Sequence, residues 1–302
     1  MSRWWDIVRI HRLEYPFQIR YLCYAAVGAC YAASDAHQLS TGPVLLSVTA
    51  NFLTFVGANA LNAAVDISTD AHTEGKIDIA HGVFRLGRHQ VMSWAATEIT
   101  VALAIATAIS LWLDRALIAA GVALTVALCL LYNLEPVRLK RRGLANPVTI
   151  ALIFGPLPSL VSYSAVRPDL TASALLIFIG LGVLIAGRAL WSTVPDQIGD
   201  KATGMTTPTV RYGAWRVIVI VCYATVVGMG LLGWGLWWRY GPLWTLAGAA
   251  VNGPFLLSKL VLLRRLPNHS LPHPTQLRRR DLSSVMVADI FLTLLPLTAR
   301  GT

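Results

Sequence analysis

The sequence is dominated by apolar runs that are each long enough to cross a lipid bilayer. A membrane-spanning helix needs about 20 mostly apolar residues, and a chain inside hydrocarbon must satisfy its own backbone hydrogen bonds, so such runs form helices. We therefore predict an all-α integral membrane protein, a bundle of about nine transmembrane helices in a single domain, residues 1–302. The expected segments lie near 19–36, 43–65, 91–113, 116–134, 147–166, 170–192, 215–237, 243–263 and 282–299.

The composition supports a membrane protein and argues against a nucleic-acid-binding one. Charged residues make up 13% of the 302 residues, about half of the roughly one quarter that is usual in soluble domains. The formal net charge of +10 would suggest nucleic acid in a soluble chain. Here the Arg and Lys residues lie mostly in alternate loops, which is a topology signal. We expect membrane lipids and no nucleic acid among the partners.

The distribution of basic residues predicts which ends of the segments face the cytoplasm. The N-terminus and every second connection are rich in Arg and Lys, and the other connections hold little beyond Arg115, Arg167, Arg239 and Arg300. The positive-inside rule places the N-terminus and the long loops in the cytoplasm and the C-terminus on the other side. We expect a plasma or inner membrane protein. Residues 1–18 are predicted as an interfacial amphipathic segment with Trp4 and Trp5 at the headgroups, and residues 19–299 as the bundle.

Three polar residues recur at a spacing of four where the second apolar run ends. Asn62, Asp66 and Asp70 would share one face of a helix, at the border of the lipid. Carboxylates there are costly to keep ionised without a partner. A hard divalent cation with an anionic ligand on its far side would satisfy them.

A second pair of aspartates, Asp196 and Asp200, follows the sixth apolar run on the same side of the membrane. The chain thus resembles two related halves around a central cavity, although the likeness is short and convergence remains the alternative. Either pair of aspartates alone is explained more simply as residues that cap a helix end or keep it solvated. Two facing carboxylate pairs suit Mg²⁺, which binds through carboxylates together with substrate phosphates.

Basic residues follow both acidic motifs. Lys76 and Arg85 come after the first pair and Lys201 after the second, while Arg138 and Lys140 follow Tyr132 in the stretch 132–140. Cations beside the metal site would neutralise a leaving diphosphate. Their alternative role is topological or a contact with lipid headgroups, and for residues 141–142 and 278–280 we favour that role.

The motifs together resemble those of the UbiA superfamily of intramembrane prenyltransferases. The resemblance covers about residues 10 to 298. It is carried by Asn62-x-x-x-Asp66-x-x-x-Asp70, then Tyr132…Pro136-x-Arg138-x-Lys140, then Asp196-x-x-x-Asp200-x-x-x-Gly204. Any one of these motifs is weak, and their order and spacing on a membrane chain make the combination specific.

The resemblance implies an enzyme, a prenyltransferase that transfers alkyl groups other than methyl. Such an enzyme ionises an isoprenyl diphosphate with the help of Mg²⁺ and passes the prenyl group to a lipophilic or aromatic acceptor. By matching position, Asp66, Asp70, Asp196 and Asp200 would be the catalytic residues that hold Mg²⁺ through the diphosphate. The substrate-binding set would comprise Asn62, Lys76, Arg85, Tyr132, Arg138, Lys140 and Lys201.

The chain departs from the family pattern, and this leaves the acceptor open. The stretch 75–88 lacks the Arg-Pro pair that many members carry after the first motif, and Ala63 stands where several subfamilies have Asp. A membrane-bound terpene cyclase, which ionises the same diphosphate without an acceptor, is the main alternative. The deep segments favour it weakly, because Ser159, Ser162 and Ser164 are their nearest polar group. A transporter with acidic gating residues is less consistent with acids at the inner ends of segments.

Overall fold

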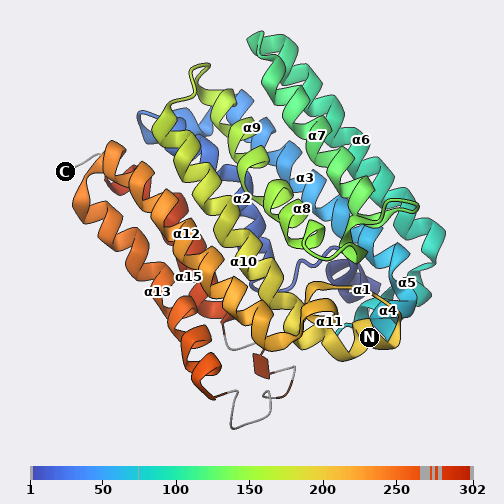
Figure 1. Cartoon of the computed structure of the whole chain (residues 1–302). Helices are drawn as coiled ribbons and strands as arrows, with labels where there is room; N and C mark the ends of the chain where they lie inside the picture. Colours follow the sequence, from blue (N-terminus) through green and yellow to red (C-terminus); the bar gives the residue numbers. More distant parts are fainter. Residues whose placement is uncertain (1–2, 74, 266–272, 274–275, 278–280, 300–302) are drawn as a thin grey trace.

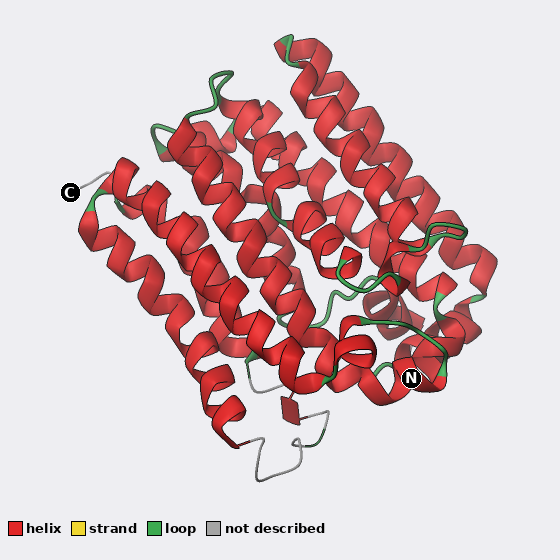
Figure 2. Cartoon of the chain, viewed as in Figure 1, coloured by secondary structure: helices red, strands yellow, loops and turns green. Residues whose placement is uncertain are grey.

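The structure is a computed structural model that describes residues 3–73, 75–265, 273, 276–277 and 281–299. In this part of the chain the secondary structure consists of helices joined by loops and turns, with no strand (Figure 2). Every predicted apolar run coincides with helix, so the all-α membrane class is confirmed. Among the described residues, seven helical segments are long and apolar enough to span a membrane. They are α3 (Gly42–Val65), α6 (Arg88–Leu113), α7 (Ala116–Asn133), α8 with α9 (Ala145–Phe154 and Pro156–Val166), α10 (Ala172–Ala202), α12 (Ala214–Tyr240) and α13 (Pro242–Arg265).

The first and last predicted segments are shorter than expected. Helix α2 (Phe17–Ala32) has 16 residues and α15 (Leu282–Thr298) has 17. A count of nine spanning helices is therefore not confirmed. Both helices still pack in the bundle, since α2 lies against α9 and α15.

The helices run side by side, and short elements gather at one end of the bundle (Figure 1). In the first half α3 packs on α6, and in the second α10 packs on α12. The two halves are alike in this respect. In each half, the helix that ends in an acidic motif packs on the long helix that follows the polar loop. The short elements are α1 (Arg3–Ile10), α4 (Ile67–Ala71), α5 (Ile77–Leu86), the 3-10 turn η2 (Leu139–Arg141) and α11 (Pro208–Tyr212), and a further 3-10 turn η1 (Ala36–Ser40) precedes α3.

Exposed tryptophans mark both ends of α12. Trp215 is exposed near its start, and Trp234, Trp237 and Trp238 are exposed near its end. At about 1.5 Å per residue, the stretch from Trp215 to Trp238 is roughly 35 Å long, close to the roughly 30 Å hydrocarbon core of a bilayer. Tryptophan is enriched at both membrane interfaces, so the bundle has the dimensions of a membrane protein.

Two boundaries differ from the sequence-based expectation. The run 147–166 is not one helix, because Gly155 adopts a non-helical conformation with φ −115° and ψ −103°. Pro156 follows it and has no N–H for a continuing helix, so α8 ends and α9 begins there. Helix α10 instead continues to Ala202, ten residues past the predicted end at 192. Its polar extension places Asp196 and Asp200 on the helix itself.

Close contacts between helix backbones predict a sensitive position. A Cβ atom at Gly28 on α2 would lie 1.8 Å from the carbonyl oxygen of Ser159 on α9. We expect Gly28→Ala to push these helices apart and lower the free energy of unfolding by about 1–3 kcal/mol. Gly230→Ala is the matched control, since a Cβ there meets nothing within 4 Å. Thermal unfolding in detergent measures both, and equal stability of the two variants would contradict the packing argument.

Candidate active site

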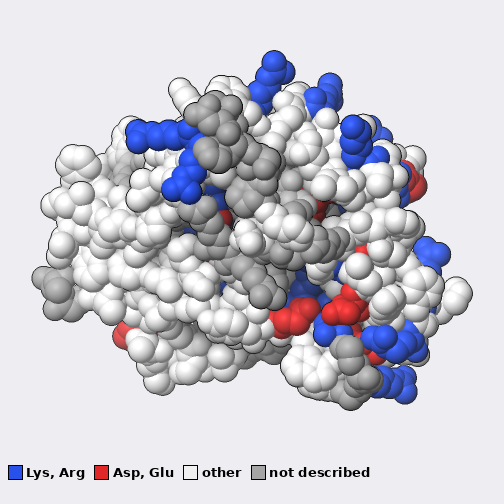
Figure 3. Space-filling view, turned by 90° about the horizontal axis from the view of Figure 1, so that it is seen from below, with Lys and Arg blue, Asp and Glu red and all other residues white. Residues whose placement is uncertain are grey.

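A cavity of about 320 Å³ opens where the short elements gather. Its lining comes from α2, α3, α4, α7, α8 and α10 and from the loop after α10. Figure 3 views the molecule from this end, and acidic and basic side chains lie together there over a hollowed part of the face. Charged side chains therefore surround the cavity at this end of the bundle.

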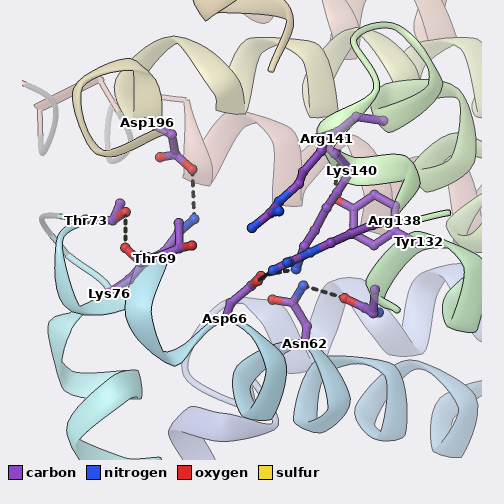
Figure 4. A network of polar contacts seen from close by, with 12 residues as sticks. Asn62, Asp66, Thr69, Thr73, Lys76, Tyr132, Arg138, Lys140, Arg141 and Asp196 are labelled. Atoms are coloured by element: carbon purple, nitrogen blue, oxygen red, sulfur yellow. Dashed lines mark hydrogen bonds and ion pairs between the residues drawn. The ribbon is translucent and has the colours of Figure 1, made fainter. Parts of the chain in front are cut away.

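Asp66 is held by two basic side chains from the segment after α7. The Nη2 atom of Arg138 lies 2.9 Å from its Oδ1, and Lys140 donates to its Oδ2 (Figure 4). Arg138 also pairs with Glu135 at 3.0 Å. Asp66, Arg138 and Lys140 are buried, and a buried charge of this kind requires an opposite charge nearby.

The first acidic motif does not lie on one continuous helix, which corrects the expectation from its spacing. Helix α3 ends at Val65, and Asp66 leaves the helical conformation with φ −99° and ψ 15° before α4 begins. The hydrogen-bond spacing nevertheless continues through the break. The N–H of Asp66 donates to Asn62 O at 2.9 Å and that of Asp70 to Asp66 O at 2.8 Å. Asn62, Asp66 and Asp70 all reach the cavity as a result.

The second acidic motif faces the first across the cavity. Lys76, which follows α4, pairs with Asp196 of α10 at 2.8 Å (Figure 4). Asp200 accepts a hydrogen bond of 2.8 Å from the hydroxyl of Thr207. An ion pair thus crosses between the two acidic motifs, which lie more than 100 residues apart in the sequence.

Amide and hydroxyl side chains link α3, α7 and α8 beside the basic residues. Asn62 donates to Asn133 Oδ1 at 2.7 Å, and Asn146 donates to the carbonyl of Lys140 at 3.0 Å. Tyr132 lies 3.4 Å from Asn146 Oδ1. The side-chain amide of Asn62 therefore bonds to α7, and only its backbone carbonyl bonds to Asp66.

The carboxylates offer oxygen donors for a divalent cation without forming a closed cage. Asp70 Oδ2 is buried and has no hydrogen-bond partner among the described residues, and burial raises the pKa of this carboxyl group. Burial also lowers the pKa of Lys140, although Asp66 opposes that shift. No group of three or more His, Cys, Asp or Glu side chains in the described ranges is close enough to hold a metal alone. The basic side chains occupy the space between the acids.

Most of the residues proposed from the sequence meet at this cavity. Its lining includes Asn62, Asp66, Asp70, Lys76, Tyr132, Lys140, Asp196 and Asp200. Arg138 joins them through Asp66. Arg85 does not, because it pairs with the buried Asp6 of α1, and Lys201 is exposed and outside the lining. Residues 278–280 and Arg300 lie outside the described residues.

A buried charged group lies deeper in the bundle and was not predicted from the sequence. Arg20, Arg188 and Asp289 form ion pairs there, and both arginines line the cavity. Their signal was present in the sequence. Arg188 and Asp289 interrupt the apolar runs 170–192 and 282–299, and ionisable residues inside such runs indicate function. The expectation that Ser159, Ser162 and Ser164 are the nearest polar groups at this depth is wrong, because Arg20 and Arg188 line the cavity and these serines do not. The hydroxyls of Ser159 and Ser162 bond to carbonyls of their own helix.

Comparison with known proteins identifies similar sequences and folds. The UbiA prenyltransferase family matches residues 21–272. A UbiA homologue from Archaeoglobus fulgidus bound to DMAPP and Mg²⁺ is 14% identical, with a TM-score of 0.74 over 97% of this chain and 99% of that one. The same homologue bound to GPP and Mg²⁺ gives 13% identity and a TM-score of 0.72 over 98% and 100%.

A further match is the structure of a digeranylgeranylglyceryl phosphate synthase, at 14% identity and a TM-score of 0.66 over 100% of both chains. At these identities the structural matches establish the fold. No match was found among the curated proteins.

The buried carboxyl group of Asp70 predicts a pH-dependent stability. Because its pKa is raised in the folded state, the group favours folding below its unfolded pKa, and this contribution is lost as pH rises through the folded value. We expect Asp70→Asn to unfold at a higher temperature than the parent at pH 7 without divalent cations, and the difference to shrink towards pH 4. Thermal unfolding across this range measures it.

Asp78→Asn, at an exposed carboxylate of α5, is the matched control and should change little. A lower stability of Asp70→Asn than of the parent at pH 7 would contradict the argument.

Proposed function

The chain belongs to the UbiA prenyltransferase family, and from that premise we propose that it is an Mg²⁺-dependent intramembrane prenyltransferase. It takes an isoprenyl diphosphate as donor and a lipophilic or aromatic molecule as acceptor. One observation supports this most strongly. Both acidic motifs line one cavity together with Lys76 and Lys140. Each motif also holds a cation that a diphosphate would attract, since Asp66 pairs with Arg138 and Lys140 and Asp196 pairs with Lys76.

The basic side chains form a preassembled diphosphate site in this proposal. Arg138 and Lys140 are held by Asp66, and Lys76 is held by Asp196. Hydrogen bonds to ionised oxygens are strong, and Arg can offer a phosphate two at once. In the free protein the aspartates hold Lys76 and Lys140 at the cavity and Arg138 beside it. With donor bound, the same cations neutralise the charge that develops on the leaving diphosphate.

The oxygen donors suit magnesium. Asp70 offers a buried carboxylate oxygen without a hydrogen-bond partner in the described chain, and Asp66, Asp196 and Asp200 line the same cavity. Mg²⁺ prefers oxygen ligands and binds through a few carboxylates plus substrate phosphates. When bound, the ion would stabilise negative charge on the diphosphate. These four residues would hold it.

Aromatic walls can protect the cation that remains after the diphosphate leaves. Tyr21 stacks on Phe154 at 5.8 Å between ring centroids, and Phe55 lies 4.8 Å from Phe154. Tyr21, Tyr24 and Phe154 line the cavity with Ile153 and Ile185. Apolar walls exclude water, which would otherwise quench an allylic cation, and aromatic faces attract positive charge.

Cyclisation without an acceptor would use the same acidic and basic residues. The buried Arg20, Arg188 and Asp289 favour transfer instead, because a hydrocarbon substrate has no use for charged groups in its wall. We accordingly place prenyl transfer first. The charged end of the bundle faces the cytoplasm in this proposal, in a bacterial inner or other plasma membrane, as the basic loops predict.

Removal of one carboxylate from either motif should abolish the reaction. We expect Asp66→Ala and Asp196→Ala each to reduce Mg²⁺-dependent release of diphosphate by at least about 100-fold, because each change leaves a cation misplaced and removes an oxygen donor. Release is measured with purified protein in lipid nanodiscs. Asp78→Ala is the control on the same side of the membrane. Full activity after chelation of Mg²⁺ would contradict the metal site.

Product analysis without an acceptor shows what becomes of the prenyl cation. Purified protein is incubated with geranyl, farnesyl or geranylgeranyl diphosphate and Mg²⁺ without acceptor, and extracts are analysed by mass spectrometry. We expect slow hydrolysis to the prenyl alcohol. A cyclic hydrocarbon as the main product would contradict prenyl transfer and show that the protein is a terpene cyclase.

A further inference from the structure

A cluster of charged side chains lies in the interior of the bundle, away from the two acidic motifs. Asp289 of α15 accepts from Arg20 Nε and from Tyr24 Oη, both of α2, at 2.8 Å each, and also pairs with Arg188 of α10. Arg188 in turn donates to Asn252 of α13 at 3.0 Å. The cluster joins four helices.

The cluster forms one wall of the cavity at a different depth from the acidic motifs. Arg20, Tyr24 and Arg188 line the main cavity. Tyr24, Arg188 and Asp289 also line a small neighbouring cavity of about 20 Å³. Arg188 precedes Asp196 by eight residues on α10, which corresponds to about 12 Å along the helix axis. The cluster therefore lies farther into the membrane than the proposed diphosphate site.

The cluster has an excess of positive charge. In the described part of the chain, Arg20 and Arg188 have Asp289 as their sole ion-pair partner. Arg20 Nη1 and Arg188 Nε make no hydrogen bond to any described residue, and neither is among the fully buried unpaired atoms. Two guanidinium groups thus share one carboxylate and keep N–H donors that can serve a ligand in the cavity.

An uncompensated charge inside a membrane protein is costly, and such residues mark sites of function. A prenyl chain is hydrocarbon and would gain nothing from this wall. An anionic group of a second substrate would balance the charge and accept the spare N–H donors. We propose that Arg20 and Arg188 bind the acidic group, a carboxylate or a phosphate, of the prenyl acceptor. This inference rests on the proposed prenyl transfer and specifies the class of acceptor.

Direct binding tests the inference without turnover. The probes are benzoate and glycerol 3-phosphate, with benzamide and glycerol as their neutral counterparts. Binding to purified protein is measured by thermal shift and by saturation-transfer NMR, with Mg²⁺ and the non-ionising donor analogue geranyl S-thiolodiphosphate present. We expect one acid to bind, its neutral counterpart not to bind, and the donor analogue to leave acid binding intact. The acid that binds distinguishes carboxylate from phosphate acceptors.

Two substitutions should move acid binding in opposite directions. Arg188→Gln removes the excess charge and leaves Arg20 paired with Asp289, so acid binding should weaken by about tenfold or more. Asp289→Asn raises the positive charge and should strengthen acid binding, whereas a cluster that only holds helices together offers no reason for a gain. Arg239→Gln is the control, at an arginine that donates to Tyr31 O outside the cavity.

Equal binding of acid and neutral counterpart, displacement of the acid by the donor analogue, or unchanged acid binding in Arg188→Gln would each overturn the inference. These results are separable from a failure of the proposed function. If the protein binds the donor analogue with Mg²⁺ but no acid, the diphosphate site stands and the acceptor site does not. If the donor analogue itself fails to bind, the proposed function is lost.

Discussion

Ionised carboxylates at the edge of a bilayer are energetically unfavourable without a partner, and much of this structure provides those partners. Asp66, Asp70, Asp196 and Asp200 all line one cavity, and each needs a compensating group. The compensation comes from distant parts of the chain, with Arg138 and Lys140 on Asp66 and Lys76 on Asp196. The loops that would otherwise be simple connections are thereby drawn over the end of the bundle. Folding and substrate binding use the same charges.

Local interruptions of the helices direct these charged groups to the cavity. The helix break at Asp66 separates α3 from α4, and Lys76 then follows α4 on the side facing α10. Arg138 adopts a left-handed conformation, with φ 38°, immediately before the turn that carries Lys140. The break at Gly155 places the backbones of α8 and α10 close together, since a Cβ there would lie 2.8 Å from Gly182 Cα. The resulting cavity is lined by charged, aromatic and aliphatic side chains together.

The deeper charged cluster changes the interpretation of the acceptor. From the sequence, Ser159, Ser162 and Ser164 were the nearest polar groups of the mostly apolar interior, and cyclisation without an acceptor was the main alternative. In the structure those serines bond within their own helix, while Arg20 and Arg188 face the cavity. A polar wall about two helical turns beyond the donor site is consistent with a second, polar substrate. Donor and acceptor would then be recognised by separate sets of charges at separate depths.

The sequence by itself determined the class of protein, the approximate limits of its helices, its family and the two acidic motifs. These depend on local properties, namely apolar run length, residue spacing and the asymmetry of Arg and Lys. It did not determine partners that depend on which helices become neighbours. Arg85 follows the first motif closely in sequence but pairs with Asp6, and Lys201 adjoins Asp200 but points to solvent. Arg20, Arg188 and Asp289 are separated by up to 269 residues and became one cluster only through the packing of α2, α10 and α15. Tertiary structure decided these contacts because charges in a low-dielectric interior pair with whatever group the packing brings within reach.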